Sequence, residues 1–245
     1  MVSILQKHNM KNIQEATLKS IALEHFEFIP ILEKYSLDFC CRGKKTLQEA
    51  CVENNVSLET ILAEINKAGI PIKIQMPFNE MSADELISYI LIHHHFYVKN
   101  AIPTILNHIE KVVNKHGEKY PQMIKVLSLF NAVADELMPH MQKEEQILFP
   151  RIKIIFGTDE HAIASQKVIG FIDGPINVME VEHEKAGDLL FEIRRITNHY
   201  KAPETACTTH RVCLDELKAF EEDLHQHVHL ENNILFPMAK LKMQN

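Results

Sequence analysis

Apolar residues recur at helical spacing along almost the whole chain, and no segment shows the strict alternation of a half-buried strand. In the first third of the chain this pattern predicts two helices, at residues 17–35 and 46–67, with a turn at residues 38–43. In the remainder it predicts four long helices, at residues 82–115, 121–156, 175–200 and 208–242. The pattern therefore predicts an all-α protein, with a small helical N-terminal domain followed by a four-helix bundle.

The boundary between these two parts is expected at a stretch rich in helix-breaking residues. Gly69, Pro71 and Pro77 interrupt the helical pattern there. Just after it, Ser82 is followed three residues later by Glu85, which is the spacing of a capping box at a helix start. We expect a small domain, a linker and a bundle domain at residues 1–70, 71–80 and 81–245. A second long connection is expected between the second and third bundle helices, at residues 157–174.

The second and fourth bundle helices carry the same motif. Residues His140–Pro150 and His227–Pro237 both read H-x-x-x-E-x-x-I-L-F-P in one register. A repeat of this length at fixed spacing indicates that the bundle consists of two copies of a helix pair.

The motif places a histidine and a glutamate on the same face of each helix. His140 and Glu144 are four residues apart, so they lie one turn apart on one side. The same stripe is expected to hold apolar residues, namely Val133, Leu137, Ile147 and Leu148. An apolar stripe faces the core. A buried carboxylate is costly unless it is paired or bound to a metal, so the motif predicts a metal site.

The first and third helices are expected to supply further histidines. In the third helix, His183 falls on the apolar stripe. In the first helix three consecutive histidines are available, and heptad-like spacing favours His95, with His94 as the alternative. His95 precedes His140 by 45 residues and His183 precedes His227 by 44, which supports His95 independently.

Together these residues form a predicted dinuclear site with four imidazoles and two carboxylates. A ligand set of nitrogen and oxygen without thiolate favours iron or manganese over structural zinc. The predicted ligands are His95, His140, Glu144, His183, His227 and Glu231.

Three more acidic residues lie close to the predicted ligands in sequence. Glu136 and Asp223 precede His140 and His227 by one turn, and Glu182 adjoins the third-helix histidine. They are candidates to orient imidazoles or to line an ion path. The alternative is that each is a solvated carboxylate at a helix edge.

Composition and charge exclude several classes of partner. The net charge is −7 and no basic stripe is present, so nucleic acid is not an expected partner. No apolar run is long enough for a membrane span, and residues 1–12 do not resemble a signal peptide. We therefore expect a cytoplasmic protein. The 15 histidines are unusually many for a chain of 245 residues, which agrees with metal binding.

The five cysteines do not resemble a disulfide framework, because their number is odd and two are adjacent. Cys40 and Cys41 are candidates for thiol chemistry, a transient disulfide with a partner or metal hand-off, or they simply pack a turn. The other three, Cys51, Cys207 and Cys213, are expected to be inert. The histidines expected at the surface are His108, His161, His199 and His210.

Five segments together resemble the repair-of-iron-centres proteins of the YtfE/ScdA type, which have a hemerythrin-like antiparallel four-helix bundle. The segments are Leu37–Leu47, Lys143–Pro150, Val178–His183, Glu204–Thr209 and Leu230–Pro237. The resemblance covers nearly the whole chain and assigns the family's ligands to the same six residues.

The resemblance also implies details of the site. The bridging carboxylates would be Glu144 and Glu231, and a further family histidine matches His116, either a weak ligand or a solvated loop residue. One departure concerns the cysteine turn, where Arg42 precedes Gly43 although the family usually has two glycines. Arginine resists backbone angles that glycine allows, so the turn is expected to differ.

The function implied by the resemblance is repair of iron–sulfur clusters damaged by nitrosative or oxidative stress. The cofactor would be two iron ions with oxo and carboxylate bridges, and the protein would donate iron to iron–sulfur client proteins as a monomer or homodimer. Nitric oxide or dioxygen would be the small-molecule ligand. The alternatives are nitric oxide reduction at the di-iron centre, which leaves enzymatic activity open, and a sensor that reports ligand state to the small domain.

Overall fold

The computed structural model describes residues 13–25, 28–39, 43–68, 78–157 and 172–244. The chain forms two compact units that divide between Phe78 and Asn79, and each unit is described by itself. The expected linker, residues 71–80, lies mostly outside the described residues, as do Cys40, Cys41 and Arg42.

The small unit contains short helices, which are α2 (Leu18–Glu24), α3 (Ile29–Lys34), α4 (Leu47–Glu53) and α5 (Leu58–Ala68). Side-chain caps fix where two of them start. Thr17 caps α2 by accepting from the backbone N–H of Ser20, and Thr46 forms a capping box with Glu49 at the start of α4. A single antiparallel bridge joins Thr17 and Thr46, so the two helix starts lie together.

The prediction of two continuous helices in this unit was wrong, because each predicted helix is two short ones. Pro30 stands in the first turn of α3, where its missing N–H is tolerated only at a helix start. Asn55 has a positive φ of 53°, which ends the helical path between α4 and α5.

The larger unit confirms the all-α prediction and contains the four expected long helices. A 3₁₀ turn, η2 (Phe78–Glu80), precedes them. Three of these four long helices contain a π-helical turn between two α-helical segments. The first long helix consists of α6 (Ala83–Tyr89), η3 (Ile90–His95) and α7 (Phe96–His116), and the second consists of α8 (Gln122–Lys143), η4 (Glu144–Leu148) and α9 (Phe149–Phe156). The third long helix is α10 (Asp173–Ile196), without such a turn, and the fourth consists of α11 (Thr208–Leu230), η6 (Glu231–Leu235) and α12 (Phe236–Gln244).

The third helix ends four residues earlier than predicted. Asn198, His199 and Tyr200 all have positive φ, between 49° and 60°, so the backbone leaves the helix before them. None of the described helices is both long and apolar enough to cross a membrane.

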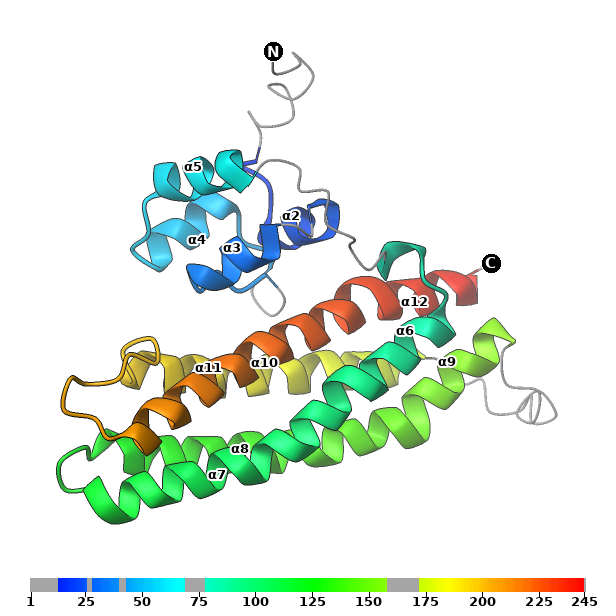
Figure 1. Ribbon diagram of the computed structural model, residues 1–245. Helices are drawn as coiled ribbons and strands as arrows, with labels where there is room; N and C mark the ends of the chain where they lie inside the picture. The colour runs from blue at the N-terminus through cyan, green and yellow to red at the C-terminus, as the bar shows by residue number, and fades with distance from the viewer. Residues whose placement is uncertain (1–12, 26–27, 40–42, 69–77, 158–171, 245) are drawn as a thin grey trace. The chain divides into compact units, whose positions relative to one another are not determined.

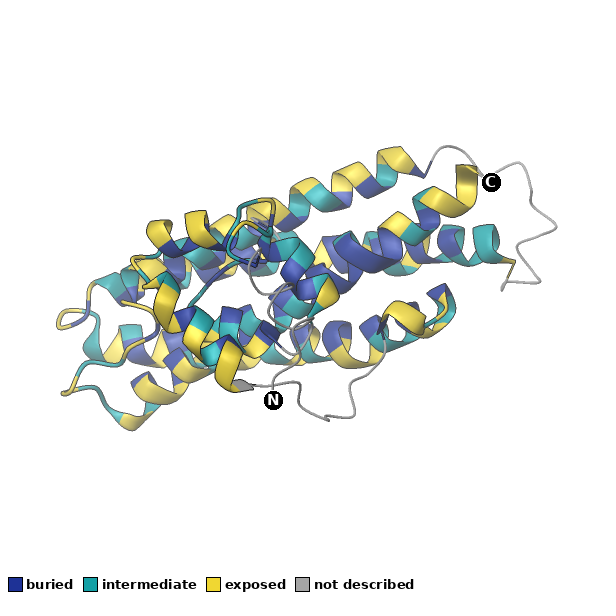
Figure 2. Ribbon diagram, turned by 90° about the horizontal axis from the view of Figure 1, so that it is seen from above, coloured by how far each residue is buried: buried dark blue, intermediate teal, exposed yellow. Residues whose placement is uncertain are grey.

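The long helices form a ring in which α8 packs against α7 and α10, and α11 packs against α7 (Figure 1). Buried residues follow the inner faces of the helices and exposed residues the outer faces (Figure 2). Phe130 and Phe220, both fully buried, meet edge to face with ring centroids 5.2 Å apart. This arrangement is favourable for aromatic pairs and helps to join α8 to α11.

Two of the three π-helical turns, η4 and η6, have the same cause. Phe149 donates its N–H to the carbonyl of Glu144, and Phe236 donates to Glu231, five residues back in each case. Pro150 or Pro237 follows directly and has no N–H to donate, and a proline ring clashes with the carbonyl four residues before it. A widened turn relieves this conflict, and such turns are frequent at functional sites.

Because of the widened turn, the prediction was wrong for one residue of the apolar stripe. Val133, Leu137 and Leu148 are buried as expected, whereas the side chain of Ile147 is 46% exposed. An extra residue in the turn rotates the positions within it, so regular helical spacing places Ile147 on the wrong face.

Replacing Phe130 by alanine should lower the free energy of unfolding of the bundle by about 3–5 kcal/mol, because it leaves a cavity against Phe220. Denaturant unfolding of the metal-free protein, followed by helical circular dichroism, measures the loss. The control is Ile124→Ala on the same helix, where the side chain is 53% exposed and the expected change is about 0.5 kcal/mol or less. Similar losses in both variants would contradict the described core.

Candidate metal centre

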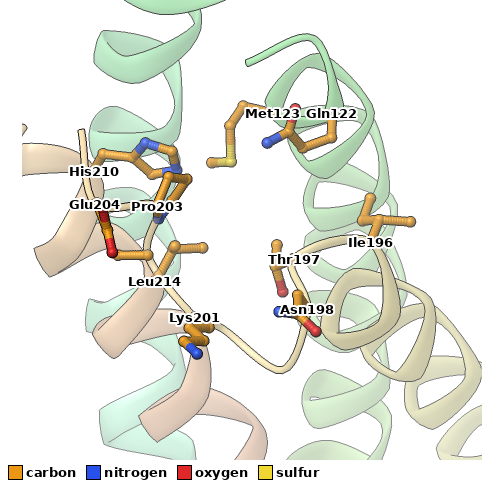
Figure 3. A pocket seen from close by; sticks show the side chains of 11 residues that line it. Gln122, Met123, Ile196, Thr197, Asn198, Lys201, Pro203, Glu204, His210 and Leu214 are labelled. Carbon is orange, nitrogen blue, oxygen red and sulfur yellow. The ribbon is translucent and has the colours of Figure 1, made fainter. Parts of the chain in front are cut away.

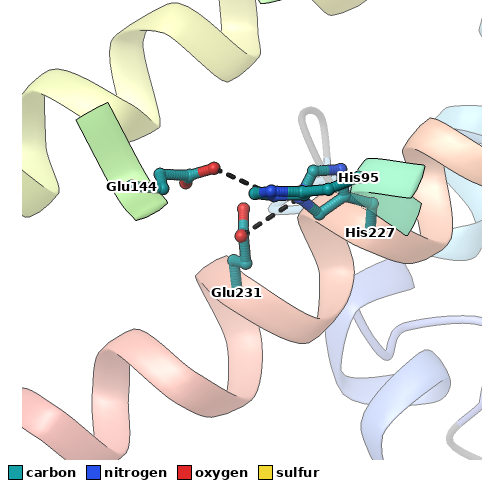
Figure 4. A group of neighbouring side chains, drawn as sticks. All are labelled: His95, Glu144, His227 and Glu231. Carbon is teal, nitrogen blue, oxygen red and sulfur yellow. Dashed lines mark hydrogen bonds and ion pairs between the residues drawn. The ribbon is translucent and has the colours of Figure 1, made fainter. Parts of the chain in front are cut away.

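Six buried side chains from the four long helices converge at one point in the bundle. They form two overlapping groups of possible metal ligands, and within each group the ligand atoms all lie within 4.8 Å of one another. One group is His95, Glu144, His227 and Glu231 (Figure 4), and the other is His140, Glu144, His183 and Glu231. Each of the six is at most 1% exposed. The structure thus brings together all six residues that the repeat and the stripe singled out.

Both glutamates belong to both groups, and each turns one oxygen towards each group. The imidazoles face them through Nε2 in every case. The distances are 3.3 Å for Glu144 Oε2 to His95 Nε2 and for Glu144 Oε1 to His140 Nε2, and 3.1 Å for Glu231 Oε1 to His227 Nε2 and for Glu231 Oε2 to His183 Nε2. The two groups therefore lie side by side and have both carboxylates in common, so that each is a candidate cation position.

Two of the π-helical turns begin at these glutamates. Glu144 is the first residue of η4 and Glu231 is the first residue of η6, while His95 is the last residue of η3. Widening the helix at these points changes the direction of the residues that follow each glutamate. The repeated Phe-Pro pair thus acts on the geometry of the site as well as on the backbone.

Several polar atoms in the centre lack a hydrogen-bond partner among the described residues. These atoms are both carboxylate oxygens of Glu144, Oε2 of Glu231 and Nε2 of His95. In addition, Nε2 of His183 lies 2.9 Å from Nε2 of His140, so two ring nitrogens meet head on. Buried polar groups are nearly always satisfied, and an ion is one of the explanations for exceptions. The converging lone pairs fit a pair of cations.

The charges inside the centre depend strongly on one another. Burial raises the pKa of Glu231, but the neighbouring His227 and His183 outweigh it and hold the pKa well below its usual value. Burial lowers the pKa of His140, but Glu144 and Glu231 raise it to about 9. In the metal-free protein the carboxylates are therefore ionised and His140 carries a proton that a metal ion must displace.

Three of the four histidines form a hydrogen bond through Nδ1, the ring nitrogen that does not face the glutamates, to a polar side chain behind the ring. His140 contacts Glu182 at 2.9 Å, His95 contacts Glu145 at 2.7 Å, and His183 contacts Asn232 at 2.9 Å. Such partners fix the tautomer and the direction of a ligand imidazole.

Comparison with known proteins agrees with this geometry. The family model of the hemerythrin HHE cation-binding domain matches residues 86–239, and that of a domain of unknown function, DUF542 (ScdA_N), matches residues 14–69. Proteins named iron-sulfur cluster repair protein YtfE are 34% identical over 227 residues, which is 92% of this chain and 97% of theirs. They come from Escherichia coli strains UMN026 and K12/DH10B and from Shigella boydii strain Sb227. The chain belongs to the YtfE family. The resemblance seen in the sequence is thereby confirmed.

Within this family fold, the other predicted site residues have different positions. Of the acidic neighbours, only Glu182 touches a ligand histidine. Glu136 pairs with Lys185 at 2.5 Å, and Asp223 contacts Nδ1 of His94 at 3.0 Å. His116 lies about 30 Å along the helix from His95, where its ring meets that of Tyr120.

The residues that sequence reasoning missed are Glu145 and Asn232. Each directly follows a ligand glutamate, so they occupy equivalent positions of the repeat. That shared position was the available signal. Spacing along one helix did not show that they reach histidines of other helices.

Among the histidines expected at the surface, only His199 is exposed as predicted. His108 is half-buried, with Nδ1 2.7 Å from Glu216, and His161 lies outside the described residues. His210 is 1% exposed, so its prediction was wrong. It lines a cavity of about 360 Å³ formed by the loop before α11 and the first turns of α8 and α11 (Figure 3), where its ring also packs on Tyr120.

The thiol groups of Cys51 and Cys213 are free and buried. Burial, with a smaller contribution from Glu216, raises the pKa of Cys213 to about 12. A protonated, buried thiol is a poor nucleophile, which agrees with the inert role expected for these residues.

Loading the metal-free protein with a divalent cation such as Mn²⁺ should release protons, because His140 is protonated below a pKa of about 9. Affinity should therefore rise as the pH increases from 6.5 to 9. Calorimetry at pH 7.5 in buffers of different ionisation enthalpy measures the release. A binding enthalpy that does not change with the buffer would show that no proton is displaced.

Proposed function

We propose that this protein holds two iron ions in the centre and donates iron to iron–sulfur clusters damaged by nitrosative or oxidative stress. The observation that carries the proposal is the pair of adjacent cation positions built from four imidazoles and two shared carboxylates. The relatives' name, iron-sulfur cluster repair protein, supplies the process and favours iron over manganese.

Each ion would have its own pair of histidines. His95 and His227 would hold one ion, His140 and His183 would hold the other, and the two carboxylates would bridge them. Because nitrogen and oxygen ligands bind iron without the strong retention of thiolates, the set suits a protein that must both hold and release its cargo.

The protein's own residues would provide the contact between centre and surface. Glu182 contacts His140 inside and is 20% exposed outside, where Lys143 pairs with it. Asp223 is 22% exposed and contacts His94, which lies beside the other pair of histidines. Each cation position therefore has a partly exposed carboxylate near it, and these two residues remain our candidates to line an ion path.

A second candidate function is chemistry or sensing with nitric oxide or dioxygen. Each cation position has only four protein ligands, and iron commonly accepts more, so a small molecule or an oxo bridge has room to bind. Repeated formation of nitrous oxide by one centre would support reductase activity. A single reaction per centre would exclude catalysis.

The partners that follow are iron–sulfur client proteins, and we predict that the encounter takes place in the cytoplasm. The oligomeric state, monomer or homodimer, and any thiol role of Cys40 and Cys41 remain predictions from the sequence.

Replacing Glu144 or Glu231 by alanine should reduce bound iron from two ions per chain to one or fewer, because each carboxylate serves both positions. Iron analysis of protein loaded under anaerobic conditions measures the loss. The matched control is Glu136→Gln, since Glu136 is on the same helix as the ligands but pairs with Lys185. Retention of two ions in Glu144→Ala would contradict the proposed bridging role.

Iron-loaded protein should restore activity to an enzyme whose iron–sulfur cluster has been damaged by nitric oxide, under anaerobic reducing conditions. Radioactive iron in the centre should appear in the repaired cluster. The control is the Glu231→Ala variant, which should transfer little label because it holds little iron. Recovery of activity at the same rate with free ferrous iron would argue against a specific donor role.

A further inference from the structure

The two cation positions differ in the groups that hold their histidines. The intervals of the repeat make His95 equivalent to His183, so the residues just before them, His94 and Glu182, are also equivalent. Glu182 reaches across to Nδ1 of His140. His94 lies beside the corresponding histidine, His227, but contacts it by ring stacking and not by a hydrogen bond.

The ring of His94 stacks on that of His227, with centroids 5.5 Å apart and an interplanar angle of 5°. Stacked rings cannot hydrogen-bond to each other through their edges. The Nδ1 atom of His227 is buried and has no hydrogen-bond partner among the described residues. His227 is therefore the only one of the four ligand histidines that no described side chain holds from behind.

A carboxylate is close by but is engaged elsewhere. Asp223 precedes His227 by one turn, yet its Oδ1 accepts from Nδ1 of His94 at 3.0 Å. The other oxygen of Asp223 and Nε2 of His94 are also buried without a partner in the described part of the chain. One oxygen of Asp223 is thus paired with His94, and no described carboxylate is hydrogen-bonded to Nδ1 of His227.

Removing such a partner from a ligand histidine typically costs about 10–100-fold in metal affinity. One position has a carboxylate behind His140 and an amide behind His183, while the other has a carboxylate behind His95 and nothing from the described residues behind His227. Solvent exposure near the two positions does not offset this difference in histidine support. The side chains of Asp223 and Glu182, one near each position, are similarly exposed, at 22% and 20%.

We infer that the two positions bind iron unequally, and that the ion between His95 and His227 is the one that leaves first. This inference rests on the proposed two-iron centre, and it makes His94 a positioning residue that weakens one position through His227.

The test is the rate at which an excess of a ferrous chelator removes iron from protein loaded with two Fe²⁺ ions under anaerobic conditions. The wild type should release its iron in two phases of equal amplitude, one ion each. His94→Glu introduces the carboxylate found at the equivalent position 182 and should slow the fast phase about tenfold. Glu182→Gln removes a carboxylate from the other position and should accelerate the slow phase.

The matched control is His93→Glu, which adds the same charge at a neighbouring exposed position and should leave both phases unchanged. His94→Gln, which offers a neutral acceptor, serves if the glutamate variant does not fold. It should slow the fast phase less than His94→Glu does.

A single phase for both ions in the wild type would overturn the inference, as would a change in the slow phase alone in His94→Glu. Neither result would affect the proposed function, since two ions would still be bound. If the loaded protein instead contains fewer than two ions, the proposed two-iron centre itself is wrong.

Discussion

The structure depends on the burial of two carboxylates, Glu144 and Glu231, side by side in the core of a helical bundle. Two ionised groups at this depth repel each other and lose their hydration, so they are tolerated only with positive charge between them. Four imidazoles surround them, and in the metal-free state a proton on His140 supplies part of that charge. Polar side chains on Nδ1 of three of these imidazoles help to keep the groups converging.

The duplicated helix pair explains how one chain brings together two groups of candidate metal ligands. Each copy contributes two histidines and one glutamate, and the Phe-Pro pair widens the same turn in both copies. The repeat is strict in the six candidate ligands and in the two Phe-Pro turns. It is relaxed in the residues behind the ligands, where Glu145 is matched by Asn232 and Glu182 by His94. The two positions can therefore differ in affinity while their ligands stay the same.

The convergence of the six candidate ligands was predictable because the signals that mark these residues are local. Histidine and glutamate four residues apart on an apolar stripe are expected to face the core. Heptad-like spacing selected His95 from three candidates, and the repeat supported that choice. The partners behind the histidines were not predictable in this way, since Glu145 and Asn232 reach across to other helices. Ile147 was misplaced because regular spacing cannot show a π-helical turn. His210 was misplaced because Tyr120, which is distant in the sequence, packs against its ring.

Charge balance explains why a donor of this design would release one ion more readily than two. The shared carboxylates carry two negative charges, and a single ferrous ion carries two positive ones. After the first ion leaves, the remaining ion still neutralises Glu144 and Glu231, so no buried charge is left without compensation. Departure of the second ion would leave both carboxylates dependent on protonated histidines. The shared pair of carboxylates thus allows one ion to remain bound after the other has left. The unequal hydrogen bonding of the histidines decides which ion leaves first.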